Sequence, residues 1–246
     1  MKSTPALSMA GIQSGLPEGR WVRELAALEA RLHDHFADAF HQPSSLVVHV
    51  TPEPGRPVAS GRFQSLDVGF ENGFLDIIAL RYVQIRFYEP AIDMQILETQ
   101  GSVEFVQPPR TDMRLTIQEE SLNRILEMKQ GDLKMKEARL NLEDGQIHFT
   151  GRIKTLFLEN KLKVKGNLMV TPTGELNFQP SALSVGVIPL PQAMIAGIAR
   201  RANPLFDLGN LNKLLGIVVN LDSIDIEPGQ IVISTPAARH WRPHGS

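Results

Sequence analysis

The chain of 246 residues contains no cysteine, which excludes disulfide bonds, thiolate zinc sites and cysteine nucleophiles. Aromatic residues are also scarce, with only two tryptophans and two tyrosines. Surfaces that bind single-stranded nucleic acid combine aromatic side chains with lysine and arginine. The few aromatic residues and the formal net charge of -2 therefore argue against a nucleic-acid partner.

Long apolar runs are missing too. One of the most apolar windows, VIPLPQAMIAGIARR at 187–201, is interrupted by prolines and is too short for a membrane span, which takes about 20 apolar residues. Residues 1–21 lack the continuous apolar segment of a secretory signal. As the chain is given, we expect a cytoplasmic or membrane-peripheral protein, or a cell-envelope protein if a leader was removed.

The sequence also lacks the motifs that carry common catalytic chemistry. It has no Gly-x-Ser-x-Gly, His-Glu-x-x-His, Gly-x-x-x-x-Gly-Lys or Gly-x-Gly-x-x-Gly segment. A lipid hydrolase would therefore lack a recognisable nucleophile. Asp34, Asp38 and His41 share one helical face, which suits either a metal ion or a solvated surface. We expect no enzymatic activity, no metal and no cofactor.

What the sequence does contain begins with a long amphipathic helix. Large apolar residues recur every three or four positions from Trp21, with charged residues between them, and the pattern ends before Pro43. The apolar residues of this stripe are Trp21, Leu25, Leu28, Leu32, Phe36 and Phe40. Such a stripe must be covered, either by the core or by a ligand.

Most of the remaining chain alternates polar and apolar residues, which predicts strands with one wet face. The clearest alternation runs through 147–157 and 162–170. Further strands are expected at Leu46–Val50, Arg62–Phe70, Leu75–Phe87, Asp93–Phe105, Leu176–Phe178, Leu183–Val187, Gly216–Ile226 and Ile231–Ser234. Turns are expected at Asp144-Gly145, Glu159-Asn160, Pro172-Thr173-Gly174 and Glu227-Pro228-Gly229.

Two short helices interrupt the strands. The first is expected to be capped by Thr116, with Glu119 three residues later, and carries Leu122, Ile125 and Leu126 on one face. The second begins near Pro191 and stops at Asn203-Pro204, with Met194, Ile195 and Ile198 as its apolar stripe.

Together these elements predict an α+β fold in which a long helix packs in one strongly curved antiparallel sheet. We expect a flexible leader over residues 1–17, a single domain over 18–235 and a disordered tail over 236–246.

From Met113 the chain resembles the bacterial LmeA-like phospholipid-binding family. The resemblance rests on MRLTIQEESLNRIL, LKMKEARLNLEDGQIHFTGRI, LKVKGNLMVTPTGELNFQPSALSVGVIPLP and IDIEPGQIVIS, in that order, and extends to the segment from Trp21 to Thr235. It implies a tubular lipid-binding fold, in which a groove between helix and sheet holds lipid, and it implies a phospholipid partner.

Both lines of reasoning favour non-catalytic binding of phospholipid or another acyl lipid in an apolar groove, extending to transfer. The residues expected to line the groove are Leu25, Leu28, Leu32, Phe36, Leu122, Ile125, Leu126, Met194, Ile195 and Ile198. The alternative is a fully packed scaffold or adaptor domain that binds a protein.

Five cations are expected to dock the protein transiently on a membrane. Arg200 and Arg201 end the third predicted helix, where cations are favoured by the helix dipole and can reach lipid phosphates. Lys161, Lys163 and Lys165 project from one face of a strand. For all five, a merely solubilising surface is the alternative interpretation.

Overall fold

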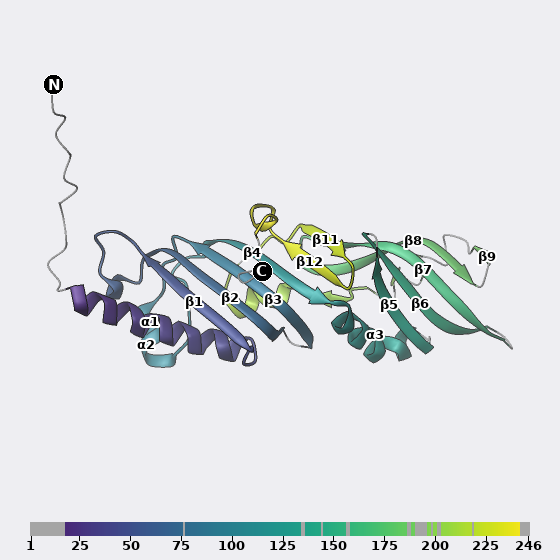
Figure 1. Ribbon diagram of the computed structural model, residues 1–246, viewed down its shortest axis with the longest axis horizontal. Coiled ribbons are helices and arrows are strands. Elements are labelled where there is room, and N and C mark those ends of the chain that lie inside the picture. The colour runs from purple at the N-terminus through teal and green to yellow at the C-terminus, as the bar shows by residue number, and fades with distance from the viewer. Residues whose placement is uncertain are drawn as a thin grey trace, which may run out of the picture.

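The computed structural model describes residues 18–75, 77–133, 136–143, 145–155, 158–185, 188–189, 196–197, 199–200, 203–217 and 219–241. Figure 1 shows an elongated molecule in which two antiparallel sheets follow one another along the long axis. The strand order is β1-β2-β3-β4-β12-β11 in the first sheet and β10-β8-β7-β6-β5 in the second, where β9 also pairs with β8. The predicted α+β class with antiparallel sheets is confirmed.

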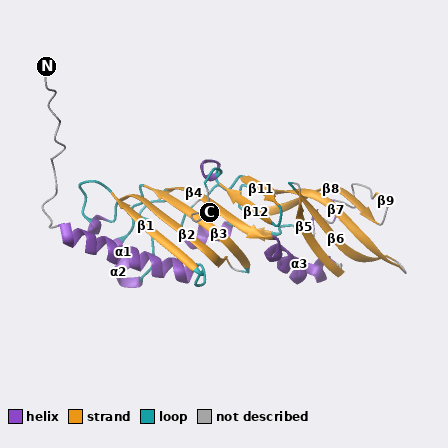
Figure 2. Cartoon of the chain, in the orientation of Figure 1, coloured by secondary structure: helices purple, strands orange, loops and turns teal. Residues whose placement is uncertain are grey.

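The strands of the first sheet are β1 (Ser45–Pro52), β2 (Phe63–Leu75), β3 (Ile78–Tyr88), β4 (Arg110–Gln118), β11 (Ser223–Glu227) and β12 (Gln230–Ser234). Those of the second are β5 (Lys136–Glu143), β6 (Gln146–Thr155), β7 (Leu158–Val170), β8 (Glu175–Val185), β9 (Ile188–Pro189) and β10 (Phe206–Asp207). The helices include α1 (Glu18–Ala39), α2 (Met94–Gln100), α3 (Glu119–Leu133) and α5 (Gly209–Leu215), with the 3-10 turns η1 (Val58–Ser60) and η2 (Pro236–Ala238). In Figure 2, α1 and α3 lie along one long edge of the molecule.

The sheet is not continuous, contrary to the sequence prediction. The chain leaves β4 through α3, so β5 begins in the second sheet, and the place beside β4 is taken by β12 from the end of the chain. Ile117 of β4 lies opposite Ile231 of β12. The halves nevertheless share one apolar core, because a single cluster of buried side chains includes residues of both sheets, α1, α3 and α5.

Helix α1 forms where the sequence predicts a long amphipathic helix. Leu28, Leu32 and Phe36 are 3%, 0% and 1% exposed, while Leu25 is half-buried. On the flank of this stripe, the Glu29 carboxylate accepts a hydrogen bond of 2.9 Å from the backbone N–H of Val50. The helix therefore covers the free edge of β1 as well as part of the core.

The strand predicted over Asp93–Phe105 is wrong, because this segment contains α2. The Asp93 carboxylate accepts hydrogen bonds from the N–H groups of Gln95 and Ile96, at 2.9 and 3.0 Å, and so caps the helix. Gly101 ends it in the left-handed conformation, at φ 70°. Caps at both ends favour one short helix over an extended strand.

Two other boundaries also differ from the prediction. Thr116 is a strand residue opposite Tyr82 and Val232, so α3 begins at Glu119 rather than after a threonine cap. The strand expected from Gly216 begins only at Ser223. Gly216 itself is the C-cap of α5, at φ 62°.

The turns of the second sheet follow the sequence pattern in two places. Gly145 and Gly174 adopt positive φ at the tips of the β5–β6 and β7–β8 hairpins, as predicted. The turn predicted at Glu159-Asn160 is wrong, since both residues belong to β7 and lie opposite Lys154 and Ile153. The connection between β6 and β7 therefore comes earlier in the chain than predicted, and residues 156–157 lie outside the described part.

Two asparagine side chains occupy the outer edges of the second sheet. Asn123 of α3 donates to the carbonyl of Leu140 on β5 at 2.9 Å and accepts from its N–H at 2.7 Å. Asn203 forms the same pair of bonds with Phe178 on β8, at 2.8 and 2.7 Å. Each amide thus satisfies a backbone donor and acceptor that a further strand would otherwise pair.

The segment expected to be a disordered tail is ordered up to Trp241. Pro236 opens η2, Ala238 is fully buried, and Arg239 pairs with Asp225 at 3.0 Å. The Arg239 carbonyl also accepts a hydrogen bond of 2.7 Å from Arg114. These contacts order a segment for which composition alone predicts disorder.

Candidate functional site

The residues predicted to line a groove belong to one apolar cluster. Leu122, Ile125 and Leu126 of α3 are each 2% exposed, and they join the buried residues of α1 in the same core. Such burial fits a packed core, and it fits a groove wall only if helix and sheet separate around a ligand. Their role in a groove therefore stays a prediction.

The third predicted helix is described only in small part. Met194, Ile195, Ile198 and Arg201 lie outside the described residues, whereas Arg200 is helical and exposed. Lys161, Lys163 and Lys165 are exposed along β7, on the side opposite to the buried Leu162 and Val164. The predicted alternation of this strand is thus confirmed.

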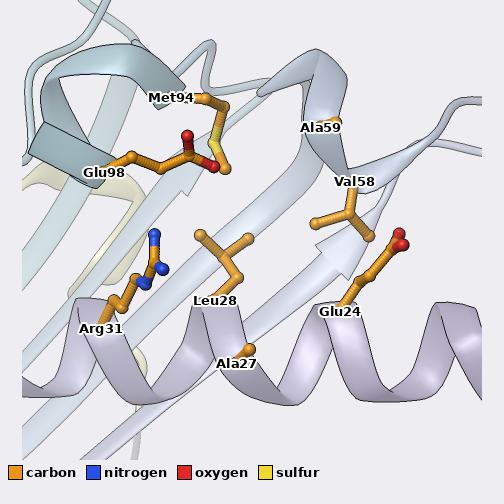
Figure 3. A pocket seen from close by; sticks show the side chains of 8 residues that line it. All are labelled: Glu24, Ala27, Leu28, Arg31, Val58, Ala59, Met94 and Glu98. Carbon is orange, nitrogen blue, oxygen red and sulfur yellow. The ribbon is translucent and has the colours of Figure 1, made fainter.

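A pocket with a mostly apolar lining lies beside α1, with a volume of about 270 Å³. We call it the α1 pocket. Figure 3 shows side chains from α1, η1 and α2 converging on it. Its apolar lining residues are Ala27, Leu28, Val58, Ala59 and Met94, and its charged lining residues are Glu24, Arg31 and Glu98. Leu28 is both a predicted groove residue and a lining residue of this pocket.

The charges at the α1 pocket are unevenly matched. Glu24 pairs with Arg20 one turn away on α1, at 2.9 Å. Arg31 makes no salt bridge with any described residue, and in Figure 3 its guanidinium points from α1 toward the space below α2. Glu98 of α2 also lines the pocket and likewise makes no salt bridge with a described residue. An arginine that is not held in an ion pair beside an apolar wall is suited to an anionic group attached to an apolar chain.

One turn further along α1, His35 lies near the end of α2. Burial lowers the pKa of His35, against the smaller raising effects of the Gly101 backbone and the Asp38 carboxylate. Burial therefore favours the neutral form of His35 at the junction between α1 and α2.

The sequence did not reveal Val58, Met94 or Glu98 as site residues. Met94 and Glu98 were missed because the segment after Asp93 was interpreted as a strand. Asp93 before an apolar pair, with Gly101 eight residues later, is the helix signal that would have placed both side chains on one helix.

A second pocket, of about 250 Å³, lies between the β7–β8 turn and α5. Val170, Leu208, Val219 and Leu221 contribute apolar surface, and Asn212 is among the polar lining residues. The Asn212 side chain is already engaged, since it accepts a hydrogen bond of 3.0 Å from the N–H of Val219. Within the lining we find no unpaired cation comparable to Arg31.

Other kinds of site are not apparent in the described part of the chain. Its Asp, Glu and His residues form no group of three placed to hold a metal ion. None of its helices combines the length and apolarity that a membrane crossing requires.

Comparison with known proteins gives one result. No curated protein and no solved structure matches the chain. Residues 25–235, however, match the family described as LmeA-like phospholipid-binding, a range that includes both sheets, α3 and most of α1. The lining residues of the α1 pocket, except Glu24, and the buried residues of the shared apolar core lie within this range. The chain therefore belongs to the LmeA-like phospholipid-binding family.

Proposed function

We propose that the protein binds phospholipid, with an acyl chain against the apolar lining of the α1 pocket and the phosphate beside Arg31. Membership of a phospholipid-binding family supports a lipid partner. The observation that carries the proposal is the make-up of this pocket, where apolar residues of three elements surround an arginine without an ion pair among the described residues. An amphiphile has the complementary structure.

The α1 pocket has room for only part of a lipid, since sites for drug-sized ligands usually have about 300–1,000 Å³. We propose that the acyl chain continues along α1 past Leu25, Leu32 and Phe36, as in a tubular lipid-binding architecture. The remaining wall would come from α3 and the third predicted helix. It would consist of Leu122, Ile125, Leu126, Met194, Ile195 and Ile198.

Movement of the helices away from the sheets is part of this proposal, because the α1 and α3 side chains are buried. Each methylene of lipid that leaves water contributes about 0.8 kcal/mol, so a chain inserted over several methylenes can offset such a separation. Binding of this kind needs no catalytic group, and release at a membrane would make the protein a lipid carrier.

Native mass spectrometry of the purified protein, followed by extraction and identification of bound lipid, tests the function directly. Phospholipid in near-stoichiometric amount is the expected result. A protein without lipid that also fails to bind a fluorescent phospholipid saturably would instead favour a packed scaffold or adaptor domain.

Two neighbouring alanines allow a matched test of the α1 pocket. Ala27 lines the pocket, whereas Ala26 is an exposed residue of the same helix outside its lining. Ala27→Trp fills the pocket and should weaken binding of a fluorescent phospholipid at least tenfold, while Ala26→Trp should bind like wild type. Equal binding by the two variants, with equal thermal stability, would place the lipid elsewhere.

A further inference from the structure

Cations line up on the outer face of the second sheet. Lys161, Lys163 and Lys165 alternate along β7 with buried leucine and valine, so all three point away from the core. Across the sheet, Lys161 lies opposite Arg152 of β6. Lys163 lies opposite Thr150, which in turn lies opposite Arg139 of β5. Residues that face one another across strands share a side of the sheet, so three strands contribute to one basic surface.

We name this surface the distal basic face. It consists of Lys136, Arg139, Arg152, Lys161, Lys163 and Lys165, all of which are exposed. In Figure 1, β5, β6 and β7 occupy the end of the molecule opposite to α1. The face is therefore remote from the α1 pocket.

Carboxylates neutralise only one corner of the distal basic face. Arg152 pairs with Glu137 at 2.9 Å, and Lys136 pairs with Glu159 at 3.1 Å. The other four cations make no ion pair within the described part of the chain; they are Arg139, Lys161, Lys163 and Lys165. The sequence has more carboxylates than cations overall, so this local excess leaves the rest of the molecule more negative.

Short side chains lie beside two of the lysines of the distal basic face. Thr150 and Ser184 lie on either side of Lys163, and Ala182 lies opposite Lys165. Successive outward residues of a strand are roughly 7 Å apart, and neighbouring strands are about 4.8 Å apart. Long lysine side chains above such short neighbours can all reach one planar, negatively charged surface.

The chemistry of the face favours a lipid surface over nucleic acid. Bases stack on aromatic side chains in single-strand binding, and the described tryptophans and tyrosines lie elsewhere, on α1, on β3 and after η2. A bilayer rich in anionic lipid needs only a plane of cations within reach of its phosphates.

We propose that the distal basic face docks the protein flat on an anionic lipid bilayer. This role is separate from lipid uptake at the α1 pocket, because the two surfaces lie at opposite ends of the molecule. Docking by exposed cations alone is reversible and is screened over about 10 Å at 0.1 M salt. It would bring the second sheet to a membrane while α1 stays accessible.

Vesicle sedimentation tests this proposal. Wild type should sediment with vesicles of phosphatidylcholine mixed with phosphatidylglycerol, less as salt rises, and should stay in solution with phosphatidylcholine alone. The triple variant Lys161→Glu, Lys163→Glu and Lys165→Glu should bind the mixed vesicles about a hundredfold more weakly, since each cation near an anionic membrane contributes roughly fivefold.

A second triple variant controls for net charge. Arg62, Arg81 and Lys213 are exposed cations outside the distal basic face, and their replacement by Glu changes the net charge equally. This control should sediment like wild type. We call the variant with Glu at positions 161, 163 and 165 the β7 variant. If the control loses as much vesicle binding as the β7 variant, or if the β7 variant still sediments like wild type, the proposal is wrong.

Folding and lipid uptake are checked on the same proteins. A glutamine version, Lys163→Gln with Lys165→Gln, should show an intermediate loss of sedimentation and an unchanged thermal transition. Uptake of a dispersed fluorescent phospholipid should be the same in the β7 variant and in wild type. Loss of uptake in the variant that carries Glu at 161, 163 and 165 would contradict the separation of the two surfaces.

Discussion

The outer faces of the two sheets both carry cations, but the first sheet pairs its cations more fully than the second. On the first sheet, Arg86 bonds to Asp67, which raises the pKa of Arg86, and its guanidinium lies 5.9 Å from the ring centre of Trp241. Arg110 lies 4.0 Å from the ring centre of Tyr88. On the second sheet, Lys161, Lys163 and Lys165 have no such partners among the described residues.

The arginines of the first sheet are thus held by partners within the protein, whereas the three lysines of β7 remain available to a ligand. Trp241, in the segment after η2, lies over Arg86 of the first sheet. Arg239 of the same segment pairs with Asp225, and its carbonyl accepts a hydrogen bond from Arg114. Exposed ion pairs of this kind contribute only about 0–1 kcal/mol each, yet they leave little charge for a partner. The second sheet keeps its charge available.

The strongest way to test how far the halves differ is to remove a large side chain from their shared core. Phe36 is 1% exposed and stacks on Phe87 of the first sheet at a ring distance of 6.5 Å. Phe36→Ala should cost about 3–5 kcal/mol of unfolding free energy. Because both sheets share one core, hydrogen exchange should accelerate in β2 and in β7 together.

Val22 supplies the control for this substitution, since it lies on the same helix and is 56% exposed. Val22→Ala should leave the unfolding free energy nearly unchanged. Faster exchange confined to the first sheet in Phe36→Ala would show that the halves unfold independently.

A smaller effect is expected when the first sheet is made to resemble the second. Asp67→Asn, Asp112→Asn and Asp225→Asn leave side-chain size unchanged. They remove the carboxylate bonded to Arg86, the carboxylate opposite Arg86 on β4 and the carboxylate bonded to Arg239. The freed arginines should increase binding to anionic vesicles roughly tenfold. Unchanged sedimentation by a folded triple variant would mean that position in the molecule, and not pairing, decides which face docks.

The smallest change is expected from the cations outside both faces. Arg200 is exposed, and Arg201 lies outside the described residues. If one of these two residues reaches the membrane, Arg200→Glu with Arg201→Glu should weaken binding to anionic vesicles by about fivefold. Sedimentation equal to that of wild type would limit docking to the distal basic face.

Local patterns predicted much of the fold because they depend on residues close in sequence. The stripe from Leu25 to Phe36 and the alternation from Lys161 to Lys165 each fix one element and its buried side. The break between the sheets was not predictable in this way, because β12 pairs with β4 across more than a hundred residues.

The candidate site was predicted less well than the fold. Leu28 could be chosen from its helical stripe, but Val58 and Met94 reach the α1 pocket from separate elements brought together by the fold. Lys163 could be seen as an exposed cation, whereas its alignment with Arg139 depends on the register of three strands. Sequence patterns identify such side chains and the tertiary structure groups them.

The asparagines at the margins of the second sheet bear on how the protein behaves when crowded on a membrane. Uncovered strand edges join edge to edge with other copies and can grow into fibres. The side-chain amide of Asn123 forms hydrogen bonds with the backbone N–H and C=O of Leu140, and that of Asn203 does the same with Phe178. If the protein docks as proposed, copies concentrated on one bilayer should therefore lie next to each other without adding strands at Leu140 or Phe178.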